Sequence, residues 1–177
     1  MRMYSAIIAA LLVALGSSAS AQVQKGMVAG VTNFSKVETT IACGGATTSA
    51  AVPELKKLGY VTIINLRLPT EQGAEVEAEM AAAKAASMSY IALPFNAASP
   101  DPAVVDRFIA AVTAPANQPA FIHCASANRV GALWMVKRIL VDNWAQDRAL
   151  TEATAIGLTS AALKTFALDY VAAHKRP

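Results

Sequence analysis

A cysteine and an arginine five positions apart are the residues of this sequence best suited to covalent chemistry. Cys124 follows the apolar stretch 119–123, and Arg129 precedes the helix-forming stretch 131–141. The unpaired amides and the partial positive charge at a helix N-terminus favour the nucleophilic thiolate over the thiol. The same amides bind anions, and an arginine can clamp an oxyanion through two hydrogen bonds. We therefore predict that Cys124 is a nucleophile and that Arg129 stabilises the oxyanion.

The residues next to Cys124 and Arg129 are predicted to orient the thiol and to bind the substrate anion. His123 is predicted to hydrogen-bond the loop backbone and so set the orientation of the thiol; a packed histidine at a strand end is the alternative. Four residues lie between Cys124 and Arg129, and their backbone amides are predicted to bind the substrate anion: Ala125, Ser126, Ala127 and Asn128.

The elements that must position this loop alternate between β-branched and Ala-rich stretches. Strands are predicted over 39–42, 60–66, 89–93 and 119–123. Helices are predicted over 48–58, 71–86, 131–141, 145–156 and 160–174, and from Asp101-Pro102 onward. This alternation predicts an α/β fold of three layers, α/β/α, with a mostly parallel central sheet. Ligands bind such sheets at the carboxyl ends of the strands, which is where Cys124 is placed.

The first 21 residues are predicted to be a secretory signal peptide. Arg2 precedes the apolar run 6–15, and Ala19-Ser20-Ala21 is a small-residue cleavage pattern. The run is shorter than the roughly 20 residues that cross a bilayer. We expect one exported domain over 22–177 without stable membrane insertion, periplasmic if the source is Gram-negative and otherwise secreted. An uncleaved N-terminal anchor is the alternative.

Composition excludes several classes of partner. The chain has 15 Lys and Arg against 12 Asp and Glu, and a net charge of +3 is too mild to favour nucleic acid. The sequence contains no metal-ligand cluster and no nucleotide-binding loop, so we expect neither a metal nor a cofactor. It gives no indication of the oligomeric state.

The two cysteines of the chain allow a different interpretation. Disulfides persist in exported proteins, and an even count is compatible with a bridge between Cys43 and Cys124. Such a bridge would block the nucleophile and leave a non-catalytic anion-binding or redox module.

Three motifs are shared with a known family. They are Cys43-Gly44-Gly45-Ala46-Thr47-Thr48, then Leu58-Gly59-Tyr60 leading to Ile64-Asn65-Leu66-Arg67, and His123-Cys124-Ala125-Ser126-Ala127-Asn128-Arg129-Val130-Gly131-Ala132-Leu133-Trp134. Over nearly all of 30–170 the chain resembles the bacterial phosphatase-like proteins related to tyrosine and dual-specificity phosphatases. These include the phosphatase-like domain of β-lactamase hydrolase-like proteins. The resemblance implies the cysteine-phosphatase superfamily fold, a small oxyanion or phosphorylated substrate, and a phosphocysteine formed on Cys124.

The chain departs from the phosphatase pattern at several positions. Phosphatases of this superfamily place five residues between cysteine and arginine, whereas this chain has four, as in rhodanese-type sulfurtransferases. Val130 replaces the Ser or Thr that eases release of the thiolate, and Asn96 stands nearest the place of the general-acid Asp. Asp101 is the nearby acid and a candidate for that role, with helix capping as the alternative. Ala127 replaces a loop glycine, which matters if that position needs φ > 0.

Two charged residues complete the candidate site. Arg67, at the end of a central strand, and Glu71 can face the same crevice, with Arg67 as a substrate-binding residue; surface charge around a turn is the alternative. The sequence as a whole favours a phosphatase-type hydrolase. A rhodanese-like sulfurtransferase that carries a persulfide on Cys124 is the first alternative, because it needs no general acid and suits a four-residue loop.

Overall fold

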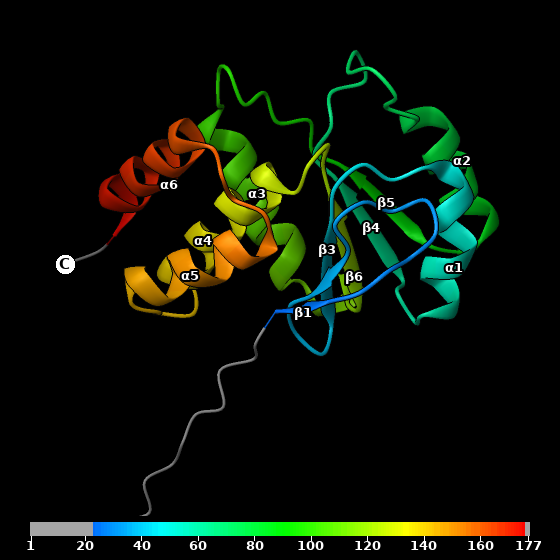
Figure 1. The fold of residues 1–177 in the computed structure, drawn as a ribbon, viewed down its shortest axis with the longest axis horizontal. Helices are drawn as coiled ribbons and strands as arrows, with labels where there is room; N and C mark the ends of the chain where they lie inside the picture. Colours follow the sequence, from blue (N-terminus) through cyan, green and yellow to red (C-terminus); the bar gives the residue numbers. More distant parts are fainter. Residues whose placement is uncertain (1–22, 176–177) are drawn as a thin grey trace, which may run out of the picture.

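The computed structural model describes residues 23–175 and confirms the three-layer α/β arrangement (Figure 1). The signal peptide predicted over 1–21 lies outside the described residues. One mixed sheet has the strand order β1–β2–β3–β6–β4–β5. Its parallel part consists of β3 (Ile41–Gly44), β6 (Ala120–His123), β4 (Thr62–Asn65) and β5 (Ser89–Ala92). The antiparallel extension consists of β1 (Gln24–Lys25) and β2 (Ser35–Lys36).

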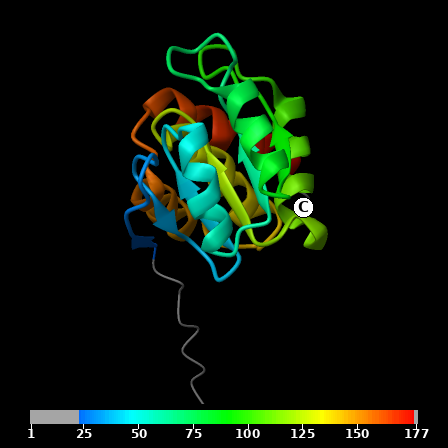
Figure 2. The ribbon, with the colours of Figure 1, turned by 90° about the vertical axis from the view of Figure 1, so that its right-hand side faces the viewer.

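Helices cover both faces of the sheet. One face carries α1 (Val52–Lys57), which follows a short 3-10 turn (Ser49–Ala51), and α2 (Val76–Ala85). Figure 2 looks onto these two helices, with the sheet behind them. The other side carries α3 (Pro102–Thr113), α4 (Asn128–Leu140), α5 (Gln146–Ile156) and α6 (Ala161–His174) (Figure 1). A second 3-10 turn (Pro115–Asn117) leads from α3 to β6.

Alternating side chains of the central strands build two separate cores. Ile63 and Phe121 belong to the core beneath α1 and α2, whereas Ile64 and Ile122 belong to the larger core beneath α3 to α6. All four are fully buried, which is why these strands read as continuous apolar runs. Cys124 belongs to the larger core, so its thiol lies on the α4 side of the sheet.

The predicted elements are found, with informative shifts at their ends. Strands β4, β5 and β6 lie within the predicted stretches, whereas β1 and β2 were not predicted. Helix α4 begins three residues earlier than expected, so the loop after Cys124 is tight. Helix α2 begins five residues later than expected, because residues 71–74 form a turn in which Gly73 has a φ of 68°. That conformation is incompatible with a helix.

Candidate active site

Cys124 follows the last residue of β6, at the carboxyl edge of the parallel strands. Its amide donates to Gly44 O at 3.4 Å, and the next residue is fixed because Ala46 N donates to Ala125 O at 2.8 Å. A Cβ on Gly45 would lie 3.3 Å from the Cα of Ser126 and 2.4 Å from a threonine hydroxyl. The glycine turn after β3 therefore supports the loop by close backbone approach. The Cys124 side chain is fully buried at the base of this loop.

Ala127 adopts the left-handed backbone conformation. Its φ is 71° and its ψ is −1°, and it is the N-cap residue of α4. An alanine in this region carries strain of roughly 1 kcal/mol. No side chain caps the helix at this residue, so the first amides of α4 stay available to an anion.

Asn128 holds the loop against the junction between α5 and α6. Its Oδ1 accepts hydrogen bonds from Thr159 N at 2.7 Å and from Ser160 N at 2.8 Å, and its Nδ2 donates to Ser126 Oγ at 3.2 Å. The side chain of Asn128 is therefore structural, and what it offers to an anion is its backbone amide.

Arg129 is held end-on by a carboxylate. Its Nη2 donates to Glu71 Oε2 at 2.7 Å, and its Nη1 donates to Glu71 Oε1 and to the carbonyls of Leu66 at 3.1 Å and Phe95 at 3.0 Å. Within the described part of the chain, Nε–H and the second Nη2 hydrogen have no oxygen acceptor. These two donors form the side-on fork of the guanidinium, which can bind an oxyanion through two hydrogen bonds.

The charges of this pair are mutually stabilised. Burial raises the pKa of Glu71, but hydrogen bonds from Arg129, Leu68 N and Arg67 outweigh it and lower that pKa to about 2. Burial likewise lowers the pKa of Arg129, but Glu71 and Cys124 outweigh it and raise that pKa. Glu71 is therefore ionised at neutral pH and has no proton to donate.

Arg67 has a structural role in place of the predicted substrate contact. Its Nη1 donates to Gly73 O at 2.7 Å, its Nη2 to Gln72 O at 2.6 Å and its Nε to Glu71 Oε2 at 3.2 Å. The side chain is almost fully buried. Arg67 thus fixes the turn that presents Glu71 to Arg129, whereas the sequence predicted a substrate contact for it.

His123 also departs from its predicted contact. Its ring stacks on Phe121 at 5.7 Å between centroids, on the side of the sheet opposite the core that contains Cys124. Its Nε2 lies 3.1 Å from Glu79 Oε2, and its buried Nδ1 has no hydrogen-bond partner among residues 23–175. The side chain makes no bond to the loop backbone, so His123 is a packed histidine with an acidic partner.

Asp101 caps α3, and its exposed carboxylate accepts a hydrogen bond from Ala103 N at 2.9 Å. It does not line the hollow above the loop, which has a volume of about 470 Å³. Ten residues line that hollow: Leu68, Glu71, Asn96, Ala97, Ala98, Ser126, Asn128, Arg129, Ser160 and Leu163. Glu71 is the one acid among them, and Asn96 occupies the side where a general acid was expected.

Both cysteines are free, so the structure does not contain the disulfide considered from the sequence. Cys43 is fully buried within β3. Burial, together with the nearby charge of Glu152, raises the pKa of its thiol well above the ordinary value. Cys43 therefore behaves as a core residue, and Cys124 is the thiol placed at the loop.

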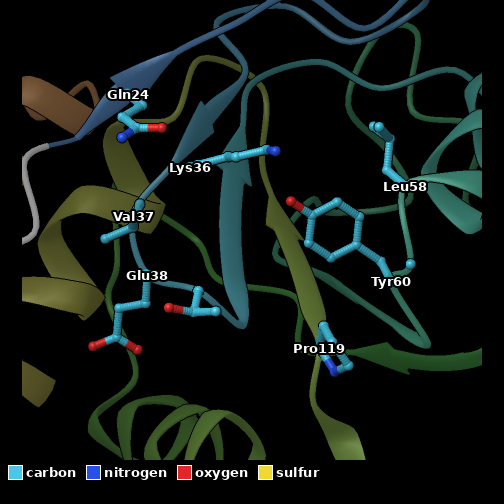
Figure 3. Close-up of a pocket in the computed structure, with 9 residues that line it drawn as sticks. Gln24, Lys36, Val37, Glu38, Leu58, Tyr60 and Pro119 are labelled. Carbon is cyan, nitrogen blue, oxygen red and sulfur yellow. The ribbon is translucent and has the colours of Figure 1, made fainter.

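A second hollow, of about 410 Å³, lies at the other end of the sheet (Figure 3). It is bounded by residues that precede the parallel strands: Gln24, Lys36, Val37, Glu38, Thr39, Leu58, Gly59, Tyr60 and Pro119. It contains neither Cys124 nor Arg129.

Among residues 23–175 there is no group of three or more His, Cys, Asp or Glu side chains that could hold a metal ion. No helix of the described chain is long and apolar enough to cross a membrane.

Solved structures share this fold at low sequence identity. A DUF442 protein from Shewanella putrefaciens superposes with a TM-score of 0.70 and 18% identity, over 83% of this chain and 96% of that one. TpbA from P. aeruginosa gives a TM-score of 0.67 and 22% identity, over 88% and 91% of the two chains. The core catalytic domain of the PP-IP phosphatase Siw14 from S. cerevisiae gives 0.66 and 23%, over 81% and 88%. No curated protein sequence matches this chain.

The sequence itself matches a family profile. Residues 33–141, more than half of the chain, match the family described as "Beta-lactamase hydrolase-like protein, phosphatase-like domain". The matched range includes the turn after β3, the turn with Glu71 and the loop from Cys124 to Arg129. The fold and the predicted resemblance are thereby confirmed. This chain belongs to the phosphatase-like domain family of β-lactamase hydrolase-like proteins and has the cysteine-phosphatase fold.

Proposed function

We propose that this chain is an exported cysteine-dependent phosphatase that hydrolyses phosphate monoesters through a phosphocysteine on Cys124. The observation that carries the proposal is the side-on fork of Arg129: its two donors have no oxygen acceptor among residues 23–175, the guanidinium interacts with the Cys124 thiol, and Glu71 holds it from the opposite edge. Because Arg129 interacts with the Cys124 thiol, we expect an anion bound between this fork and the loop amides to lie next to that thiol. Export rests on the signal sequence predicted over residues 1–21.

The reaction proceeds in two displacements. The Cys124 thiolate forms a bond to phosphorus while the bond from phosphorus to the ester oxygen breaks, and Arg129 stabilises the equatorial oxygens. Water then forms a bond to phosphorus while the S–P bond breaks, which releases inorganic phosphate and the thiolate.

The residues around Cys124 predict that neither displacement is assisted by a proton or hydroxyl donor of the site. Glu71 is ionised and bound to Arg129, so the leaving oxygen must take its proton from solvent. Val130 is fully buried and offers no hydroxyl to the departing thiolate. We therefore expect faster turnover with aryl esters, whose leaving groups need little protonation, than with alkyl esters.

The lining of the hollow favours a substrate with a single phosphoryl group. Its walls include Leu68, Ala97, Ala98 and Leu163, and Arg129 is its one cationic residue. A polyphosphate would need several cations. TpbA has been solved in complex with pTyr, at 21% identity to this chain, and Siw14 is a PP-IP phosphatase. Of these two chemistries, the lining is compatible with the aryl monoester.

A second candidate is sulfur transfer, favoured by the four-residue loop and by the absence of a general acid from the hollow's described lining. The Cys124 thiolate would form an S–S bond to the sulfane sulfur of a donor such as thiosulfate, whose own S–S bond breaks to release sulfite. The persulfide would then pass its outer sulfur to an acceptor thiol.

The two candidates are separated by parallel assays of p-nitrophenyl phosphate hydrolysis and thiosulfate-dependent sulfur transfer. Cys124→Ser should lower phosphate turnover by about three orders of magnitude or more, and Cys43→Ala should leave it within about threefold in the folded protein. Undiminished turnover by Cys124→Ser would contradict both candidates. Sulfur transfer without phosphate turnover would replace the first candidate by the second.

A further inference from the structure

A buried carboxylate lies behind the reactive loop. Glu79 projects from α2 and is 1% exposed. Its Oε2 accepts hydrogen bonds from Asn65 Nδ2 at 3.0 Å and from Tyr90 Oη at 2.9 Å, and His123 Nε2 lies 3.1 Å from the same oxygen. His123 Nε2 also lies 3.0 Å from Glu79 Oε1. These partners come from three neighbouring strands, β4, β5 and β6, and give the buried carboxyl group its hydrogen bonds.

One branch of this network leads to the cysteine. His123 Nε2 lies 3.1 Å from Glu79 Oε2 and 3.0 Å from Oε1, and in the tautomer with its hydrogen on Nε2 the ring donates to this carboxylate. The ring is thereby fixed against Phe121. The carbonyl of His123 accepts a hydrogen bond from Leu66 N at 2.9 Å, and the next residue is Cys124. Glu79 thus anchors the residue from which the reactive loop departs.

The other branch leads to the arginine. The Asn65 amide that donates to Glu79 also accepts, through its Oδ1, a hydrogen bond from Arg67 N at 2.7 Å. The Arg67 side chain holds the turn with Glu71, and Glu71 holds Arg129. Each step is a direct hydrogen bond, so one carboxylate lies at the origin of both branches.

We propose that Glu79 is a positioning residue for the reaction, acting on Cys124 through His123 and on Arg129 through Asn65, Arg67 and Glu71. The inference depends on the proposed function only in that Cys124 and Arg129 are the reacting pair. It would hold equally for phosphate and for sulfur chemistry.

Glu79→Gln tests this role with little change of shape. If the amide nitrogen replaces Oε2, it faces the donors Asn65 Nδ2 and Tyr90 Oη. If it replaces Oε1, it lies 3.0 Å from His123 Nε2, which can accept a hydrogen bond only after the ring hydrogen moves to Nδ1, an atom with no partner among residues 23–175. Glu77→Gln is the matched control, because Glu77 is exposed on the same helix. Tyr90→Phe is a second variant in case Glu79→Gln does not fold, since it removes one donor from Oε2 and keeps the ring.

The measurements do not depend on catalysis. The first is the rate at which iodoacetate alkylates Cys124; trypsin separates Cys124, in peptide 108–129, from Cys43, in peptide 37–56. The second is the concentration of inorganic phosphate that protects Cys124, which reports on Arg129. For Glu79→Gln we expect alkylation to slow by about tenfold and the protective phosphate concentration to rise by about tenfold, which corresponds to the loss of about one buried hydrogen bond. Tyr90→Phe should change the alkylation rate and the protective phosphate concentration in the same direction, and Glu77→Gln should change neither quantity.

The outcomes separate this inference from the proposed function. If Glu79→Gln melts at a lower temperature but keeps the wild-type alkylation rate and phosphate protection, Glu79 is only structural and the inference is overturned. If both readouts change while the wild-type protein hydrolyses no phosphate ester, the proposed function fails and the positioning role of Glu79 stands.

Discussion

Replacing Glu71 by glutamine removes the charge that holds Arg129 while it keeps the size of the side chain. In the wild-type protein this carboxylate accepts two hydrogen bonds from Arg129, one from Arg67 Nε and one from Leu68 N at 2.8 Å. A glutamine has one oxygen for these donors, and its NH2 group would face a guanidinium. We therefore expect Glu71→Gln to lose stability and to release Arg129 from its fixed orientation.

The loss of unfolding free energy in Glu71→Gln follows from the pKa shift of Glu71. The fall of its pKa from 4.5 to about 2 corresponds to about 3 kcal/mol at 1.36 kcal/mol per pH unit. Because 23% of the side chain is exposed, solvent screens the interaction, and we expect about 1–2 kcal/mol. A guanidinium no longer held end-on samples other orientations, so kcat/KM should fall by about ten- to a hundredfold.

Urea unfolding at several pH values measures the stability term. The pKa of Glu71 is depressed in the folded state, so its contribution is complete above pH 4.5 and is lost as the pH falls toward 2. The difference in unfolding free energy between wild type and Glu71→Gln should therefore be about 1–2 kcal/mol at pH 7 and should shrink below pH 4.5.

A surface pair provides the control. Glu54 and Lys57 lie 3.3 Å apart, with side chains 48% and 75% exposed, so Glu54→Gln should cost less than about 0.5 kcal/mol. Equal unfolding free energies and equal kcat/KM for wild type and Glu71→Gln would refute the view that this carboxylate orients Arg129.

Two further predictions concern the loop and the expected general acid. Ala127→Gly relieves a φ of 71° but loses a buried methyl group, so it should change the unfolding free energy by less than about 1 kcal/mol. The same substitution at Ala132, within α4, should cost about 2 kcal/mol; equal losses in urea unfolding would show that Ala127 is unstrained. Asp101→Asn preserves the helix cap and should keep hydrolysis of p-nitrophenyl phosphate within about threefold, whereas a loss of two or more orders of magnitude would identify Asp101 as a general acid.

The sequence predicted the parts of the site that lie close together along the chain. Cys124 and Arg129 share one loop between a strand and a helix, and local patterns identify both elements. Ala127 could be recognised as a position of interest because it replaces a glycine, and the structure gives it the positive φ. The central strands β4 and β6 were recognisable because burial on both faces leaves a mostly apolar run.

The partners of the reactive residues come from distant segments and carry no local signal. Glu79 lies in an Ala-rich helix in which acids are ordinarily solvated, and its burial arises because Asn65, Tyr90 and His123 converge on it. Strands β1 and β2 are two residues long, too short for a periodic pattern. Arg67 was assigned to the substrate because the sequence does not reveal that the carbonyls of residues 72 and 73 would occupy its donors.

The central claim is that Cys124 carries the transferred group. Its most direct test is the intact mass of the reduced protein, acid-quenched within milliseconds of mixing with p-nitrophenyl phosphate and followed by peptide mapping. Because Val130 offers no hydroxyl to the departing thiolate, we predict that one phosphoryl group accumulates on peptide 108–129 and is absent in Cys124→Ser. Steady hydrolysis with Cys124 unmodified, or an added sulfur from thiosulfate with no phosphoryl adduct from the ester, would contradict the proposal.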